Sequence, residues 1–244
     1  MKKLLQKKSV KITLIIILVL GAIYTFLYVR AINERTALIH SDDVQIMCTD
    51  EHQSPYTTIH VTKGKRYAGL STGIFKFVVT PQMAIWTEDM DGNYLETLYV
   101  TKKVATINRQ SALPIYMDTL SKEGLSVDSV SSASASINTT TIRQEVDNRQ
   151  TQQFKVYMEI NNSFDYNATY KQNLPKEDPG YNTGYCGQPA VVYLAHVDLE
   201  DKTHYTLEPI GHSDPTGESP ELFQELESIQ EALQIVDKVE IVFE

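Results

Sequence analysis

The sequence predicts a mainly β domain that follows a single transmembrane helix. Two observations carry this prediction: an uncharged apolar run fills residues 12–29, and beyond it short runs of strand-favouring residues recur between turn formers. Helical periodicity is confined to a few short segments. We therefore expect one extracytoplasmic domain over residues 54–244, with one or two short helices.

The apolar run is long enough to cross a bilayer. As a helix that rises about 1.5 Å per residue it reaches about 27 Å, close to the thickness of the hydrocarbon core. The basic residues before it are Lys2, Lys3, Lys7, Lys8 and Lys11, whereas only Arg30 follows it directly. This bias places residues 1–11 in the cytoplasm and the rest of the chain outside the cell membrane. A cleaved secretory signal is the alternative, but the run ends in aromatic residues where a cleavage site requires small ones.

The charge of the exported part excludes some partners. The first 30 residues hold six basic and no acidic side chains, so the remainder carries 16 basic and 31 acidic groups, a formal net charge of −15. Such a surface repels phosphate backbones, so we expect no nucleic-acid partner. Anionic lipid headgroups are disfavoured for the same reason.

Residues 30–53 mix charged and polar side chains and predict a juxtamembrane tether with one short strand. The expected strands are YTTIHV, GIFKFVVT, MAIWTED, YLETLYVT, FKVYMEI, AVVYLAHVDL and VEIVF. In residues 154–160 apolar side chains alternate with Lys155, Tyr157 and Glu159, which predicts one packed face and one face in water.

The clearest local signal is a hairpin between residues 83 and 101. Asp91-Gly92 supplies the positive backbone torsion of a tight turn between two strand-like runs. The spacing of Asp89, Asp91 and Asn93 is also that of the start of a calcium loop. Since Gly92 is misplaced and Val100 stands where the bidentate glutamate is needed, the turn is the better interpretation.

Two helices are expected. Residues 111–123 place apolar side chains on one face before Gly124. Ser219-Pro220-Glu221 is a typical helix start, and the apolar stripe that follows it predicts a helix up to residue 235.

Cys48 and Cys186 are the only cysteines. Outside the membrane such a pair often forms a disulfide, which here would tie the tether to the loop at 184–187. Two isolated cysteines give no framework pattern, however, so two free thiols remain the alternative.

No catalytic motif appears in the exported part. His196 and Asp198 share a strand face and precede His204 and His212, but nothing indicates that these residues converge, so we expect no metal site. A G-x-S-x-G elbow is missing, and paired carboxylates adjoin turns where solvated acids are ordinary.

The loop NNSFDYNATY, residues 161–170, combines amides, a carboxylate and aromatic rings, which suit neutral sugars or peptides. The candidate ligand-binding residues are Asn162, Asp165, Tyr166, Asn167, Tyr181 and Tyr185. The alternative is a loop whose asparagines bond their own backbone while its aromatics cover the edge of the core.

Three segments carry a family resemblance: AIWTEDMDGNYLETLYVTKKVAT, KVYMEINNSFDYN and GQPAVVYLAHVDL. Together they resemble a bacterial family of predicted periplasmic proteins, domain of unknown function 2271, over roughly residues 70–244. The resemblance implies an immunoglobulin-like β-sandwich related to domains of flagellar hook caps, with no established activity. Fold likeness alone implies no function.

Residues 128–134, DSVSSAS, resemble the signature of extracytoplasmic domains that carry FMN on a threonine. Ser134 stands at the attachment position, but serines replace the signature's glycine and threonine. A serine-rich loop without a cofactor is the alternative. The sequence therefore predicts an envelope module that binds or scaffolds a protein or glycan and needs no cofactor, with a flavin-carrying electron carrier as the second hypothesis.

Overall fold

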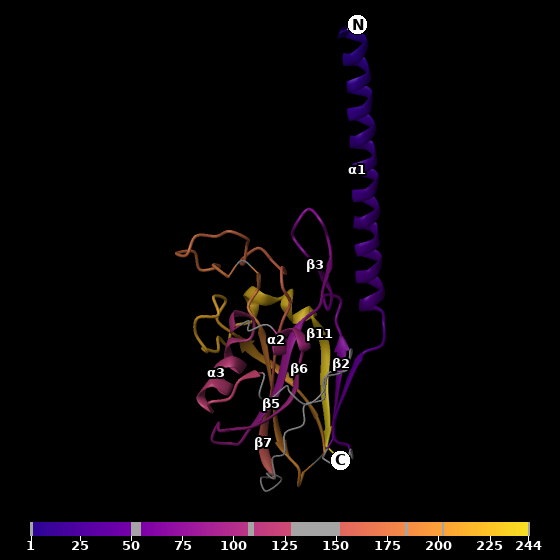
Figure 1. Ribbon diagram of the computed structural model, residues 1–244. Helices are drawn as coiled ribbons and strands as arrows, with labels where there is room; N and C mark the ends of the chain where they lie inside the picture. Colours follow the sequence, from indigo (N-terminus) through magenta and orange to yellow (C-terminus); the bar gives the residue numbers. More distant parts are fainter. Residues whose placement is uncertain are drawn as a thin grey trace.

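The protein is a three-layer β domain with one long helix that projects from it (Figure 1). The computed structural model describes residues 2–49, 55–106, 110–127, 152–183, 185–201 and 203–243. The helices are α1 (Lys2–Ile39), α2 (Lys102–Thr106) and α3 (Pro114–Lys122), with 3-10 turns at Gln110–Ala112, Glu227–Ile229 and Ala232–Gln234. The strands are β1 (Val44–Thr49), β2 (Pro55–Lys63), β3 (Gly69–Leu70), β4 (Val78–Val79), β5 (Gln82–Glu88), β6 (Tyr94–Val100), β7 (Gln153–Asn161), β8 (Val191–Asp198), β9 (His204–Thr206), β10 (Glu208–His212) and β11 (Val236–Phe243).

Two antiparallel sheets form the sandwich. One has the order β1-β2-β11-β9 and the other β10-β8-β7-β5-β6, while β3 and β4 form a separate hairpin. Apolar residues of both sheets, such as Ile59 and Ile241 of the first and Val156 and Met158 of the second, bury each other in one core. The predicted mainly β fold with one N-terminal apolar helix is confirmed.

A second core lies on the outer face of the five-stranded sheet. There α3 covers Trp86, and Tyr116 and Leu120 of α3 pack against it. The ring of Trp86 stacks on Tyr157 with centroids 5.3 Å apart. The expectation that this face of β7 meets water holds for Lys155 and Tyr157, which are half-buried, but is wrong for Glu159, which is fully buried because α3 forms a third layer there.

The hairpin of β5 and β6 is confirmed. Gly92 has a φ of 89°, and Asp89 Oδ1 accepts a hydrogen bond from the backbone N of Asn93 at 2.8 Å. The expected helix over 111–123 is present as α3. Gly124 follows it with a φ of 65°, the left-handed conformation that terminates a helix.

The helix expected over 219–235 is wrong. Ser219 does accept a hydrogen bond from the backbone N of Glu221, as a cap would. The chain then stays extended, because the backbone of Phe223 pairs with that of His212 beside β10. Only the two short 3-10 turns follow. In this segment, pairing with the edge strand β10 outweighs the local preference for a helix.

The predicted tether over 30–53 is also corrected. The helix α1 continues to Ile39, and β1 places Ile46 and Cys48 in the sandwich core. The helix end is fixed to the domain, because Lys63 Nζ donates to the carbonyl of Leu38 at 3.3 Å and to Ser41 Oγ at 2.7 Å. The domain therefore begins near Val44.

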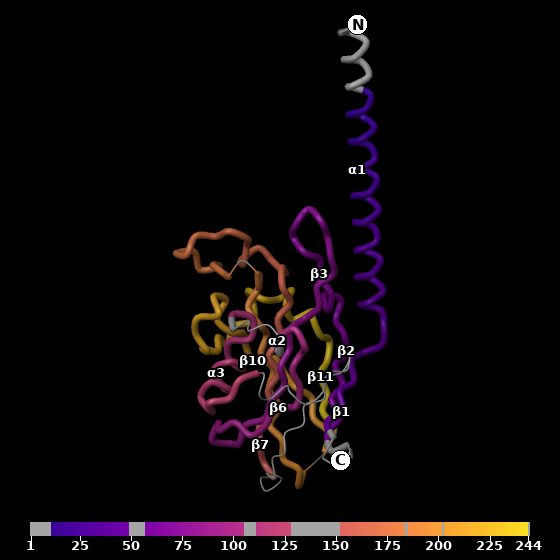
Figure 2. The backbone as a smooth tube through the Cα atoms, viewed as in Figure 1, coloured from indigo at the N-terminus to yellow at the C-terminus, as the bar shows by residue number. Residues whose placement is uncertain are grey.

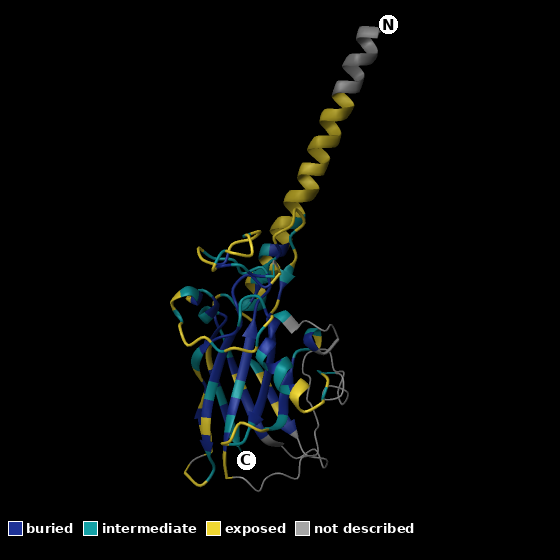
Figure 3. Ribbon diagram, turned by 90° about the vertical axis from the view of Figure 1, so that its left-hand side faces the viewer, coloured by how far each residue is buried: buried dark blue, intermediate teal, exposed yellow. Residues whose placement is uncertain are grey.

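The side chains of α1 from Lys11 to Phe26 are exposed, and the helix projects away from the domain (Figure 3). Over Lys11–Ile39 it is long and apolar enough to cross a membrane. The first covered positions are Leu27, which is half-buried, and Ala31, which is buried. The helix packs there against β3 and β4.

Candidate functional site

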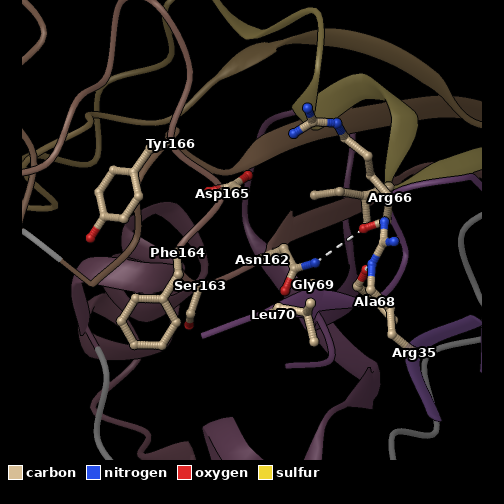
Figure 4. Close-up of a pocket in the computed structure, with 11 residues that line it drawn as sticks. Arg35, Arg66, Ala68, Gly69, Leu70, Asn162, Ser163, Phe164, Asp165 and Tyr166 are labelled. Carbon is tan, nitrogen blue, oxygen red and sulfur yellow. Dashed lines mark hydrogen bonds between the residues drawn. The ribbon is translucent and has the colours of Figure 1, made fainter. Parts of the chain in front are cut away.

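A cavity of about 290 Å³ opens at the end of the sandwich from which α1 projects. One wall is the segment 66–70 between β2 and β3, and another is the loop 162–166 that follows β7 (Figure 4). Arg35 of α1 and Ile235 complete the lining. Residues from four distant parts of the sequence thus meet around one pocket.

Hydrogen bonds hold the two walls together. Asn162 Nδ2 donates to the carbonyl of Arg66 at 3.1 Å and to that of Tyr67 at 3.5 Å. Gln82 Nε2 of β5 donates to Ser163 Oγ at 3.1 Å and holds the second wall to the sheet. Phe164 has a φ of 64°, which a non-glycine residue rarely adopts. Its backbone N donates to the carbonyl of Tyr185 at 2.9 Å, so neighbouring contacts hold this conformation.

Asp165 is the titratable carboxyl group of the pocket. Its Oδ1 accepts a hydrogen bond from the backbone N of Gln188 at 3.1 Å, and Gln188 Nε2 donates to its carbonyl oxygen at 2.6 Å. Burial raises the pKa of Asp165 well above its usual range, although the hydrogen bonds from Gln188 to its carboxyl oxygens, its own backbone N–H and the positive charge of Arg66 act in the opposite direction. The carboxyl group therefore holds its proton to a higher pH than an exposed aspartate does.

Two arginines contribute positive charge. Arg35 Nε donates to the carbonyl of Ala68 at 2.8 Å, which orients its guanidinium group. Within the described part of the chain, no hydrogen bond or ion pair engages the guanidinium group of Arg66. The buried Oδ1 of Asn162 also has no hydrogen-bond donor among the described residues. The pocket therefore offers the donors of Arg66, whereas the Oδ1 of Asn162 is enclosed by the fold.

The structure divides the six residues that the sequence proposed for ligand binding. Asn162, Asp165 and Tyr166 line the pocket. Tyr185 lies beside it, with 67 % of its surface exposed and its ring edge-on to Phe164 at 6.2 Å.

Asn167 and Tyr181 do not line the pocket. Asn167 Oδ1 accepts hydrogen bonds from the backbone N of Thr169 and Tyr170 at 2.9 and 2.8 Å. Its Nδ2 donates to Gln188 Oε1 at 3.0 Å and to the carbonyl of Ser228 at 2.7 Å. Asn167 is therefore a structural link between the loop and the segment before β11, as the alternative interpretation of the loop had it.

The cysteines are free thiols, and the disulfide prediction is corrected. Cys48 lies in the core between the sheets, where its Sγ donates to the carbonyl of Leu98 at 3.5 Å. Cys186 lies in the second core, where its Sγ donates to the carbonyl of Ser111 at 3.5 Å. The five-stranded sheet separates the two side chains.

His204 and His212 pair with separate carboxylates. His204 Nε2 lies 3.0 Å from Glu240 Oε1, and His212 Nε2 lies 2.8 Å from Glu225 Oε1. In the ranges that the structure describes, no group of three or more histidine, cysteine, aspartate or glutamate side chains could hold a metal ion.

Ser134, the proposed flavin attachment residue, lies outside the described residues. The flavin hypothesis stays a prediction.

Sequence reasoning missed Arg35, Arg66, Leu70 and Ile235. Arg35 lay in the supposed tether, and the other three lie beside or between strands, without a local motif. Only the fold brings them to Asp165, since the segments are far apart along the chain.

In comparisons with known proteins, no family model, curated protein or solved structure matches the chain. The resemblance to domain of unknown function 2271, with its immunoglobulin-like topology, stays a prediction.

Proposed function

We propose that the chain is a membrane-anchored binding module of the cell envelope. In this proposal α1 spans the membrane with its N-terminus in the cytoplasm, and the β domain lies outside. The exposed apolar side chains of α1 support the anchor, because their burial in lipid is favourable by about 25 cal/mol per Å² of apolar surface. The lysines before residue 12 support the orientation.

The pocket between 66–70 and 162–166 is the proposed binding site. The observation that carries it is the guanidinium group of Arg66, which lines the pocket and which no hydrogen bond or ion pair among the described residues engages. Its N–H donors are available to a ligand, and hydrogen bonds between a guanidinium group and a carboxylate are among the stronger ones in proteins.

The chemistry favours a peptide or glycan segment that carries a carboxylate. A guanidinium group pairs with a carboxylate through two parallel hydrogen bonds. Phe164 and Tyr166 add flat apolar faces, and the volume of about 290 Å³ suits a small segment of a larger ligand. Because burial raises the pKa of Asp165, its carboxyl group carries less negative charge at a given pH than an exposed aspartate, which weakens its repulsion of an anionic group.

The orientation is tested by adding protease to spheroplasts that contain the full chain. We expect digestion of the β domain and protection of residues 1–11. Protection of the β domain in intact spheroplasts would contradict the proposed topology.

The site is tested with soluble peptidoglycan fragments that bear free carboxylates, incubated with the immobilised full chain. Arg66→Ala should lower retention at least tenfold. Lys65→Ala is the matched control, because it removes the same positive charge from the neighbouring position. Lys65 is exposed and does not line the pocket. Equal retention by the two variants, with unchanged thermal stability, would contradict the proposed site.

A further inference from the structure

The β3–β4 hairpin exposes a compact group of apolar side chains at its tip. Ile74, Phe75 and Phe77 have 75, 69 and 59 % of their surface exposed. Single exposed apolar residues are normal on proteins, but three large ones within four positions of one tip form a patch that water disfavours.

Four hydrogen bonds centred on Ser71 close the turn. The backbone N of Ser71 donates to the carbonyl of Phe77 at 3.0 Å, and the backbone N of Phe77 donates to Ser71 Oγ at 3.1 Å. Ser71 Oγ donates to the carbonyl of Phe75 at 3.2 Å, and Lys76 Nζ donates to the carbonyl of Ser71 at 2.8 Å. Ser71 is itself buried. The turn therefore pairs the backbone groups of Ser71, Phe75 and Phe77 that these bonds engage, while its apolar side chains are exposed, which suits the interface between lipid and water.

The hairpin lies beside the one helix that could cross a membrane. Its strands pack against α1, and in Figure 1 its tip runs alongside α1 on the side toward the N-terminus. The side chain of Leu27, inside the apolar run 12–29, is already half-buried. The domain thus reaches the level at which the proposed span ends.

We infer that residues 74–77 insert into the membrane interface next to α1 and form a second contact of the domain with the lipid. The patch contacts the same bilayer that α1 spans, so the inference rests on the proposed anchor. The contact is apolar, since the acidic exported domain does not favour anionic headgroups. It fixes the domain against the membrane and holds the pocket at Arg66 close to the lipid surface.

The test uses the full chain in phosphatidylcholine nanodiscs with a bimane label on one introduced cysteine. Phe75→Cys places the label at the tip, and Met90→Cys is the matched control. Met90 is an apolar residue, 47 % exposed, in the turn between β5 and β6 at the opposite end of the sandwich (Figure 2). Val19→Cys reports the middle of α1. The native thiols are buried, and the chain without an added cysteine measures their background.

Lipids with a nitroxide near the top of the acyl chain should quench the label at position 75 at least threefold more than the label at position 90. Lipids with a nitroxide deep in the acyl chain should quench the label at position 19. Equal quenching at 75 and 90, with strong quenching at 19, would overturn the hairpin contact and leave the anchor intact. Weak quenching at both 19 and 75 would overturn the anchor and the hairpin contact together.

Discussion

The carboxyl group of Glu159 on β7 caps the N-terminus of α3, where its Oε2 accepts a hydrogen bond from the backbone N of Tyr116 at 2.8 Å. The backbone N of Ile115 donates to Oε1 at 3.4 Å. Glu159 thus serves a helix that lies far from it in sequence and that supplies no side-chain cap of its own. Glu159 therefore holds α3, the third layer of the fold, against the five-stranded sheet.

The pH dependence of stability should report this burial. Desolvation raises the pKa of Glu159 to about 8, against the two backbone hydrogen bonds that lower it. The folded state then binds the proton more tightly than the unfolded state. The contribution of Glu159 to the free energy of unfolding is therefore fully present below about pH 4.5. It is lost as the pH rises toward about 8, by at most about 1.4 kcal/mol per pH unit.

Glu159→Gln isolates this effect, because the amide oxygen can still accept the bond from Tyr116 and does not titrate. We expect the free energy of unfolding of the wild type to fall relative to that of Glu159→Gln between pH 5 and pH 8. Urea unfolding at several pH values measures the difference. A constant difference, or one of the opposite slope, would contradict the burial of an ionisable Glu159.

Gly187 should be required for the wall of the pocket. It has a φ of 63°, and a Cβ there would lie 2.6 Å from Asp165 Oδ1 and 2.9 Å from the backbone N of Tyr166. Gly124 has a similar φ of 65° with no atom within 4 Å of its Cβ position. We expect Gly124→Ala to cost about 1 kcal/mol of stability and Gly187→Ala about 1–3 kcal/mol more. Equal losses in denaturant unfolding would show that the contact with Asp165 is not tight.

Both cysteines should be present as unreactive thiols. Burial, and secondarily the negative charge of Glu96, raise the pKa of Cys48 to about 12, so its thiolate is scarce at neutral pH. Under non-reducing conditions we expect a maleimide to add to neither thiol in the folded chain and to both after denaturation. The mass of the product measures this. If the denatured chain takes up no maleimide in the absence of a reductant, the two cysteines form a disulfide and the prediction of free thiols is wrong.

The sequence indicated those parts of the fold that depend on local patterns. The Asp-Gly turn and the alternation in the first part of β7, up to Met158, are decided within a few residues, and both are present, whereas the burial of Glu159 depends on α3. The helix over 219–235 failed, because the partner of Phe223 is the distant His212. The run GIFKFVVT was predicted as one strand, but only Val78–Val79 is paired, and residues 74–77 form the hairpin tip.

Only part of the pocket lining could be predicted from the sequence. The loop 161–170 stood out through its composition, and three of its proposed residues line the pocket. Asn167 looked equally suited to a ligand, yet its amide bonds within the fold. A single side chain's hydrogen-bond partners are set by tertiary contacts, so composition could not separate Asn167 from Asn162.

The pocket beside Arg66 is proposed to bind a carboxylate-bearing envelope ligand, and a comparison of Tyr166 with Tyr181 tests this binding. Both are partly exposed tyrosines of one loop region, but only Tyr166 lines the pocket. Carboxylate-bearing peptidoglycan fragments are titrated into the full chain in nanodiscs by calorimetry. We predict that Tyr166→Ala raises Kd at least tenfold, about 1.4 kcal/mol, while Tyr181→Ala stays within twofold of the wild type. No binding by the wild type, or an unchanged Kd for Tyr166→Ala, would contradict the account.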